Sequence, residues 1–142
     1  MLRIRKTALL SALHGAKETH PDEFICLLRG EKITGGAKGA GKDGKSEKRE
    51  EGDWLISEVI IPPFASYELN ASSFSPWFIP ANSKELATFH SHPSPNTAYP
   101  SRQDLKMFAN STFNVIACFP YGVANTNVFD SKGKRIAFEI ID

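Results

Sequence analysis

The sequence predicts an α/β fold in which two helices pack against a mostly antiparallel or mixed sheet. Three observations support this prediction: an amphipathic helical pattern near the start, a second helical segment after residue 100, and short apolar runs separated by turn residues. The chain has 142 residues, 41% of them hydrophobic and 23% charged, which is the composition of a globular protein. We expect a single domain over residues 1–142. A net charge of +1 gives no indication of a nucleic-acid-binding surface.

The first helix is expected over residues 3–19, where apolar residues recur at helical spacing and charged residues fill the other face. The apolar positions are Ile4, Leu9, Leu10, Leu13 and Ala16. Pro21 ends this helix, because proline disfavours the helical conformation in the residue before it.

A strand is expected over residues 23–29, and its residues are apolar on both faces, as is typical of a strand in the middle of a sheet. Residues 31–53 then combine several glycines with many charges and contain no aromatic residue. Such a segment buries too little apolar surface to offset the entropy of ordering it. We therefore expect a flexible hairpin insertion between two strands, either a tolerated surface loop or a flap that contacts substrate.

The rest of the chain predicts further strands and one more helix, separated by Gly-, Pro- and Ser-containing turns. Strands are expected over residues 54–61, 85–90, 113–119, 123–129 and 135–141, a helix over 101–110, an extended segment over 65–74 and a short irregular or helical piece over 76–81. Cys26 and Cys118 lie within apolar runs, so we interpret them as buried thiols rather than a disulfide.

The N-terminal segment is not expected to be a signal peptide, because residues 1–13 mix charged and apolar residues and lack a cleavage site. No apolar run approaches the ~20 residues needed to span a bilayer. We therefore expect a cytoplasmic protein.

Two histidines stand at the end of the strand expected over residues 85–90. Side chains two residues apart on a strand point to the same face, so His90 and His92 can converge on one ion. Asp104 lies one turn into the next helix and can lean back toward the end of the strand. Three ligands from His, Asp or Glu, with one open position, form the donor set of a catalytic zinc. The pattern thus indicates a Zn²⁺ site at His90, His92 and Asp104.

Ser101 and Asp104 also have a second interpretation, because S-x-x-D is close to a helix capping box. A lone His-x-His pair is likewise a weak indication of a metal. The two interpretations are compatible, since Ser101 can begin the helix while its hydroxyl faces the site.

Hydrolysis at such a site needs a carboxylate that accepts a proton from water and passes it to the leaving amine. Glu23 is the leading candidate, because it stands at the start of the central strand just after the corner at residues 20–22. Asp22 and Glu58 are the alternatives. The competing interpretation of Glu23 is a solvated carboxylate at a strand end.

Together these residues resemble a known motif. They are similar to the motif of the JAMM, or MPN+, metalloproteases, which is matched here by Glu23, the run from His90 to Pro93, and Ser101-x-x-Asp104. The similarity to archaeal JAMM proteins extends to residues 20–30 and to the Phe119-Pro120-Tyr121 corner, and covers most of the chain outside residues 31–53. One difference is that eight residues separate His92 from Ser101, where the family usually has seven.

The resemblance implies a cytidine-deaminase-like α/β sandwich with Zn²⁺ at the edge of the sheet. It implies that His90, His92 and Asp104 bind the metal, that Glu23 is the general base and acid, and that Ser101 stabilises the oxyanion. It also implies cleavage of isopeptide or peptide bonds that follow ubiquitin-like modifier proteins, which would be partners together with their conjugates.

Two further functions remain open. One is a JAMM peptidase that uses the same site to trim the tail of a sulfur-carrier protein. The other is an inactive MPN-type interaction module, although such modules usually lack the metal ligands that this sequence contains. A nucleobase deaminase is excluded, because that chemistry requires H-x-E and P-C-x-x-C, and neither pattern occurs.

Overall fold

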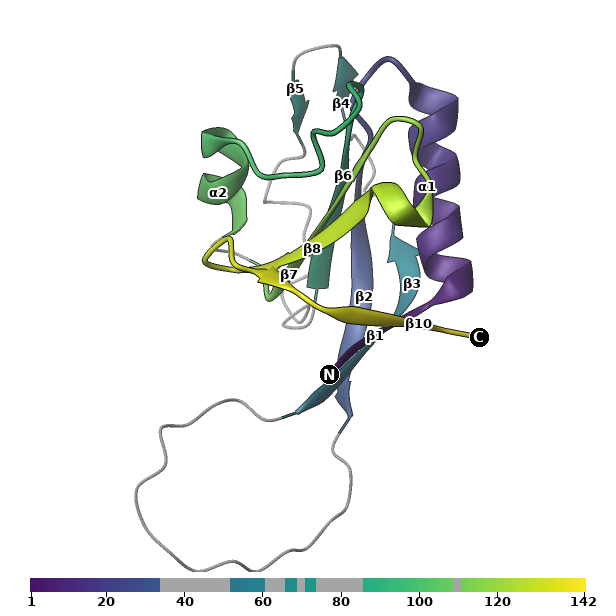
Figure 1. Cartoon of the computed structure of the whole chain (residues 1–142), viewed down its shortest axis with the longest axis vertical. Helices are drawn as coiled ribbons and strands as arrows, with labels where there is room; N and C mark the ends of the chain where they lie inside the picture. Colours follow the sequence, from purple (N-terminus) through teal and green to yellow (C-terminus); the bar gives the residue numbers. More distant parts are fainter. Residues whose placement is uncertain (34–51, 61–65, 69–70, 74–85, 109–110) are drawn as a thin grey trace, which may run out of the picture.

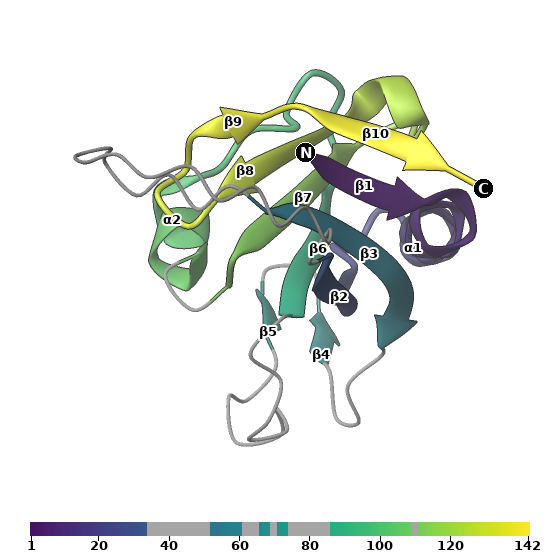
Figure 2. The ribbon, with the colours of Figure 1, turned by 90° about the horizontal axis from the view of Figure 1, so that it is seen from below.

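A mixed, strongly curved sheet lies between two α-helices in the computed structural model, which describes residues 1–33, 52–60, 66–68, 71–73, 86–108 and 111–142 (Figures 1 and 2). The strand order of the sheet is β10-β1-β3-β2-β6-β7-β8-β9. The expected α/β class and mixed sheet are thereby confirmed. Within these described ranges, no helix is long and apolar enough to cross a membrane.

The elements lie close to the predicted segments. The strands of the large sheet are β1 (Leu2–Arg5), β2 (Ile25–Ile33), β3 (Asp53–Ile60), β6 (Leu86–His92), β7 (Phe113–Cys118), β8 (Thr126–Asp130), β9 (Arg135–Ile136) and β10 (Phe138–Ile141). The helices are α1 (Lys6–Thr19), α2 (Arg102–Phe108) and a 3₁₀ turn, η2 (Val123–Asn125). A separate antiparallel pair is formed by β4 (Ser66–Glu68) and β5 (Ala71–Ser73).

The sheet contains both parallel and antiparallel pairs. β1 runs parallel to β10 and β3, and β6 runs parallel to β7. β2 lies between β3 and β6 and is antiparallel to both, which confirms it as a central strand. β2 and β3, which flank the predicted insertion, pair with each other in antiparallel orientation.

The last extended segment joins the two ends of the sheet. β9 pairs with β8, and β10 pairs with β1, although only Ala137 separates β9 from β10. Two strands at opposite ends of the strand order are thus neighbours in the chain. The sheet must therefore curl until its ends meet, and this curvature is visible in Figure 2, where the yellow strands cross above β1 and β8.

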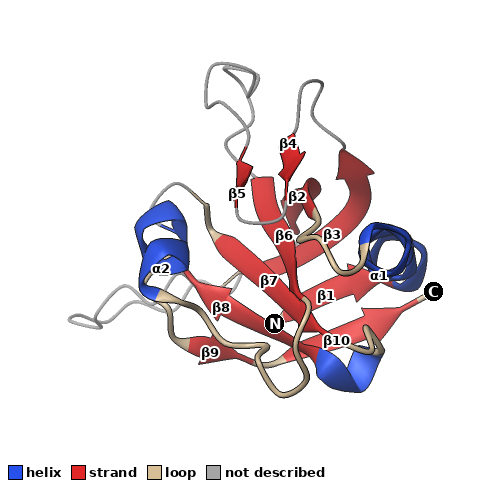
Figure 3. Ribbon diagram, turned by 90° about the horizontal axis from the view of Figure 1, so that it is seen from above, coloured by secondary structure: helices blue, strands red, loops and turns tan. Residues whose placement is uncertain are grey.

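Both faces of the central strands are covered, because α1 and α2 lie on opposite sides of the sheet (Figure 3). Alternating residues face the two helices. The larger core cluster includes Leu9 and Leu13 of α1 with Cys26, Phe89 and Val115 of the sheet. The smaller cluster is Ala98, Phe108, Ile116, Cys118 and Phe129. The expected burial of both cysteines is confirmed.

Residues 3–5 were expected to begin the first helix, and this prediction is wrong. They belong to strand β1, and the helix begins at Lys6. Leu2 and Ile4 are buried and alternate with the more exposed Arg3 and Arg5, which is the period of a strand. Ile4 fits both the helical and the strand period, so pairing with β10 and β3 decides the outcome.

The other differences between the predicted and the observed elements affect only a few residues each. Residues 123–125 form η2 rather than the start of a strand, and the strand expected over 135–141 is divided at Ala137. β2 continues to Ile33, so residues 31–33 belong to the hairpin strand rather than to the insertion. Residues 34–51 and 76–81 lie outside the described residues, and the predictions made for them stay predictions.

Candidate metal centre

His90 and His92 occupy the end of β6, which is held by backbone pairing on both sides. His90 lies opposite Ile25 of β2 and Ile116 of β7, and His92 lies opposite Cys118 of β7. Two positions of the same parity present their side chains on one face. The two imidazole centroids are 5.1 Å apart, and His90 is buried.

Asp104 reaches the histidines from the first turn of α2. Its Oδ1 lies 3.3 Å from His90 Nε2, and its Oδ2 lies 3.3 Å from His92 Nε2. Ser101 restrains the same carboxylate, because the Ser101 N–H donates to Oδ2 at 2.8 Å. In return, the Asp104 N–H donates to Ser101 Oγ at 3.1 Å. The expected capping box is therefore present, and it aims the carboxylate at the histidines.

The three side chains can hold one metal ion. Their ligand atoms all lie within 4.8 Å of one another. His90 Nε2 is buried, and its contact with Asp104 Oδ1 at 3.3 Å is not a hydrogen bond, although buried polar atoms in native proteins are nearly always hydrogen-bonded. A cation at the centre of the group would satisfy this nitrogen. Two imidazoles and one carboxylate are consistent with a zinc site that keeps an open position.

Thr97 fixes the orientation of the His92 ring. His92 Nδ1 forms a short hydrogen bond with the Thr97 carbonyl, which can only accept, so Nδ1 carries the proton and Nε2 is left to bind a metal. Thr97 in turn is held by its hydroxyl, which donates to the Ser94 carbonyl at 2.5 Å. Asn96 adopts φ 60°, a left-handed conformation that asparagine tolerates. The eight-residue connection thus folds back as a tight turn against His92.

The charges in the group favour ionised Asp104. Burial opposes ionisation of this carboxyl, but the imidazoles of His90 and His92 and the Ser101 N–H lower its pKa well below its usual range. Burial likewise opposes protonation of His92, yet the Asp104 carboxylate, the Thr97 carbonyl and the charge of Glu23 raise its pKa. The site therefore presents a carboxylate ready to bind a cation.

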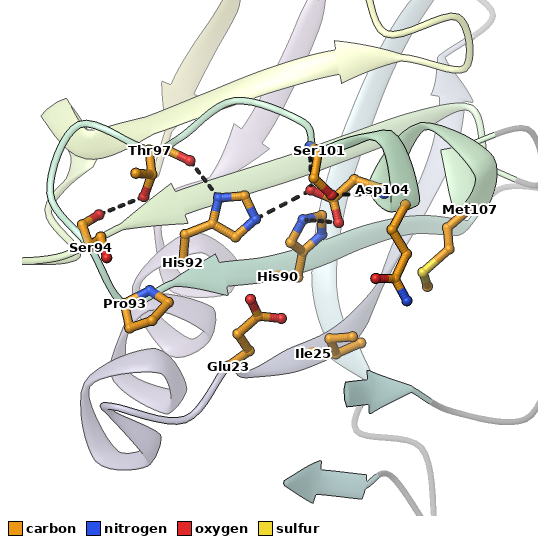
Figure 4. A pocket seen from close by; sticks show the side chains of 11 residues that line it. Glu23, Ile25, His90, His92, Pro93, Ser94, Thr97, Ser101, Asp104 and Met107 are labelled. Carbon is orange, nitrogen blue, oxygen red and sulfur yellow. Dashed lines mark hydrogen bonds and ion pairs between the residues drawn. The ribbon is translucent and has the colours of Figure 1, made fainter. Parts of the chain in front are cut away.

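Glu23 faces this group across a cavity of about 330 Å³. The strand expected from residue 23 begins only at Ile25, so Glu23 lies on the segment that leads into β2. Figure 4 shows its carboxylate extending toward the two imidazoles. The cavity is lined by Glu23, Ile25, His90, His92, Pro93, Ser94, Thr97, Ser101, Gln103, Asp104 and Met107. All five residues predicted for the site therefore lie around one cavity.

The comparisons with known proteins agree with this geometry. A family model described as prokaryotic homologs of the JAB domain matches residues 6–134. The chain belongs to this family. A Haloferax volcanii protein named "Probable metalloprotease" is 28% identical over 139 residues, which span 98% of this chain and 79% of that protein.

Solved JAB structures share the fold. A JAB1/MPN domain protein from Archaeoglobus fulgidus is 26% identical, with a TM-score of 0.62 and 99% of each chain covered. A structure named "JAMM: A Metalloprotease-like Zinc Site in the Proteasome and Signalosome" is also 26% identical, with a TM-score of 0.62, and covers 100% of this chain and 99% of its own. These similarities confirm the JAMM resemblance and the JAB1/MPN fold.

The two alternative carboxylates are placed differently from Glu23. Neither Asp22 nor Glu58 is among the described residues that line the cavity. Glu58 pairs with Arg29 at 3.0 Å on an exposed part of the sheet. His14 is exposed on α1 beside Glu18, and His20 bonds the Tyr121 hydroxyl at 2.6 Å.

Two residues that the sequence reasoning missed restrain the JAB site. Thr97 acts through its backbone carbonyl, and a carbonyl has no signature in the sequence. Ser91 lies between the two histidines, is fully buried and contacts the residue after Glu23. Its position offered a signal, since strand alternation places a residue between two ligands on the opposite, buried face, where a hydroxyl needs a partner.

Proposed function

We propose that this JAB-family protein is a zinc-dependent metalloprotease that hydrolyses isopeptide or peptide bonds following ubiquitin-like modifier proteins. The observation that carries the proposal is the convergence of His90, His92 and Asp104 opposite the carboxylate of Glu23. The metalloprotease name of the Haloferax relative and the zinc site named for the JAMM structure support it.

His90, His92 and Asp104 would hold the zinc ion. When bound, zinc supplies Lewis acidity for the substrate carbonyl and lowers the pKa of a water to about 7. The Thr97 contact keeps the metal-binding nitrogen of His92 turned toward the site.

Glu23 would act as the general base and acid. Its carboxylate lies on the same cavity as the ligands, so it can take the proton that attacking water loses. It then passes that proton to the leaving amine as the carbon–nitrogen bond breaks. The products are an amine and a carboxylic acid, which then loses its proton to solvent, and Glu23 returns to its starting state.

Ser101 would donate a hydrogen bond to the oxyanion that forms from the substrate carbonyl. Its Oγ already accepts a hydrogen bond from the Asp104 N–H. A hydroxyl that accepts one bond still has its own proton to donate. Capping α2 and stabilising an oxyanion are therefore compatible roles for this side chain.

The size of the cavity favours an extended tail as the substrate. About 330 Å³ has room for a few residues of polypeptide but not for a folded domain. A small modifier with a flexible C-terminal tail can insert the bond to be cleaved while its folded part stays outside. We expect this reaction in the cytoplasm, where the two buried free cysteines would remain reduced.

The first test is the zinc content of the purified protein by elemental analysis. We expect one zinc per chain in the wild type and its loss in His92→Ala. The matched control is His14→Ala, which removes an exposed histidine of α1 and should retain the metal. A reconstituted wild type without zinc would overturn the proposal and favour a non-enzymatic interaction module.

The second test uses β-grasp modifiers that carry a fluorescent peptide on the C-terminal carboxyl. One series has the peptide joined through a lysine side chain, and the other through an α-amine. Cleavage of the first series identifies an isopeptidase, whereas cleavage of the second alone identifies a tail-trimming peptidase. If the zinc-loaded protein cleaves no conjugate of either series, whichever modifier it carries, the proposed substrate class is contradicted.

A further inference from the structure

We infer that Ser91 is a positioning residue that fixes Glu23 relative to the metal ligands by clamping Phe24. The inference deepens the proposed function, because it rests on the role proposed there for Glu23. Ser91 touches neither substrate nor metal in this account, since its side chain lies on the face of β6 opposite His90 and His92.

Two hydrogen bonds form the clamp. The Phe24 N–H donates to Ser91 Oγ at 2.9 Å. The Ser91 N–H donates to the Phe24 carbonyl at 3.0 Å. The residue between the two histidines is thereby bonded twice to the residue that follows Glu23.

The position of the clamp at the end of the strand pair explains its importance. Regular pairing of β2 with β6 begins at Ile25 opposite His90. The Ser91 bonds extend the contact by one further residue, to the point where the chain leaves the sheet and presents Glu23 to the cavity. Without the side-chain bond, the clamp keeps only its backbone hydrogen bond.

Burial makes the clamp rigid. Ser91 is fully buried and Phe24 is nearly so. The Phe24 ring packs 6.1 Å from the ring of Phe89, on the core side of β6. Water has little access to this place, so solvent competes little with the hydrogen bond from the Phe24 N–H to the serine hydroxyl.

Thr88 provides a matched control on the same strand. It is also a buried hydroxyl residue, and its Oγ1 donates to Asn114 Oδ1 at 2.6 Å. That bond connects β6 to β7 and does not involve the chain segment of Glu23. Thr88→Val therefore removes a comparable buried hydrogen bond without touching the clamp.

The first experiment measures amide hydrogen exchange by NMR in the metal-free protein. In Ser91→Ala we expect the Phe24 amide to exchange at least about tenfold faster, while Leu27 and Leu28 keep their protection. Ser91→Thr retains the hydroxyl and should restore slow exchange at Phe24, and Thr88→Val should leave it unchanged. Unchanged exchange at Phe24 in Ser91→Ala, or equal acceleration along all of β2, would overturn the inference.

The second experiment measures turnover of a cleaved conjugate. Ser91→Ala should lower kcat by about 10- to 100-fold, because a displaced catalytic group loses its alignment, with KM and zinc content near wild type. Adding Ser91→Ala to Glu23→Gln should cause no further loss, since both changes act through one carboxylate. Additive losses would overturn the positioning role. If the wild type cleaves no conjugate, the proposed function fails, whereas the exchange experiment still tests the clamp.

Discussion

Glu23 lies just before β2 and Glu58 lies on the neighbouring strand β3, yet the two carboxylates have different surroundings. Glu23 lines the cavity beside the candidate ligands, whereas Glu58 forms an exposed pair with Arg29. The identity of the side chain is the same in both cases. At the residue scale, it is placement next to His90 and His92 that makes one carboxylate a candidate for proton transfer.

Glu23→Gln should therefore lower kcat by at least about 10²-fold while zinc remains bound, because the amide keeps the shape of the side chain but cannot accept the proton. Steady-state kinetics and elemental analysis check the two parts of this prediction. Glu58→Gln is the matched control and should retain wild-type turnover. Near-normal rates in Glu23→Gln would show that another group is the base.

The buried thiol of Cys26 makes the stability of the protein depend on pH. Burial raises the pKa of its thiol from 9.0 to about 12. In the unfolded chain the thiol ionises near its ordinary pKa, so unfolding releases a proton between pH 9 and pH 12. Stability is thus fully present below pH 9 and is lost as the pH rises through this window.

We expect the urea concentration at the unfolding midpoint to decrease as the pH rises from 8 to 10.5. The decrease should be smaller in Cys26→Ala. The absolute stability of Cys26→Ala will be lower at both pH values, because the substitution leaves a small cavity. The informative quantity is therefore the change with pH in each protein. Equal slopes in both proteins would contradict the assignment of this dependence to Cys26.

Helix α2 shows how an element orients a functional side chain. The capping box between Ser101 and Asp104 satisfies backbone groups at the helix start and also turns a carboxylate toward two imidazoles. Local helix formation and the geometry of the candidate metal centre thus depend on the same few atoms.

Ser101→Ala should lower both stability and turnover. Losing the cap costs about 1 kcal/mol, and losing an oxyanion donor costs about 10²-fold in kcat. Ser101→Gly separates the effects, because glycine is nearly as good as serine at this helix position but has no hydroxyl. We expect its thermal midpoint to be close to wild type and its kcat to be as low as that of Ser101→Ala. A glycine variant with normal kcat would reduce Ser101 to a capping role.

Short sequence spacing predicted those features that depend on residues near one another in the chain. The alternation of His90 and His92 on a strand and the cap at Ser101 both follow from short sequence spacing, and the structure contains both features. Ile4 shows the limit, because its spacing suits a helix and a strand equally well. The choice depended on β10, which lies more than 130 residues further along the chain.

The contacts that complete the site were less predictable. The Thr97 carbonyl could be any residue's carbonyl, so only the folded turn reveals that it meets His92. The division of the last strand at Ala137 also depends on two partners, β8 and β1, that no local pattern relates. In the case of Glu23, the motif gave a candidate, and its placement on the cavity required the three-dimensional arrangement.

At the scale of the whole molecule, the segment formed by β9 and β10 holds the curled sheet together. Phe138 and Ile140 of β10 are half-buried and pack against the main core. β10 also covers the edge of β1, which would otherwise present unpaired backbone groups.

Removing residues 138–142 should therefore destabilise the protein by roughly 2–4 kcal/mol, from the apolar area lost, and should promote association through the bared edge of β1. Thermal unfolding and size-exclusion chromatography over a range of concentrations test both effects. The control lacks Asp142 alone, which is exposed and follows the last strand. A truncated protein that stays monomeric with an unchanged midpoint would show that β10 is dispensable.

The shared atoms at the start of α2 also have an evolutionary consequence. A lineage that no longer needs the metal cannot discard Asp104 without also weakening the start of a helix, so loss of the ligand is not neutral. A substitution of Asp104 should be accompanied by another residue that caps the start of α2. The simplest ways are a change at residue 101 or a different hydrogen-bond acceptor at residue 104. Descendants that have lost catalysis should therefore differ at these two positions together, whereas His90 and His92 take no part in the cap and need not change with them.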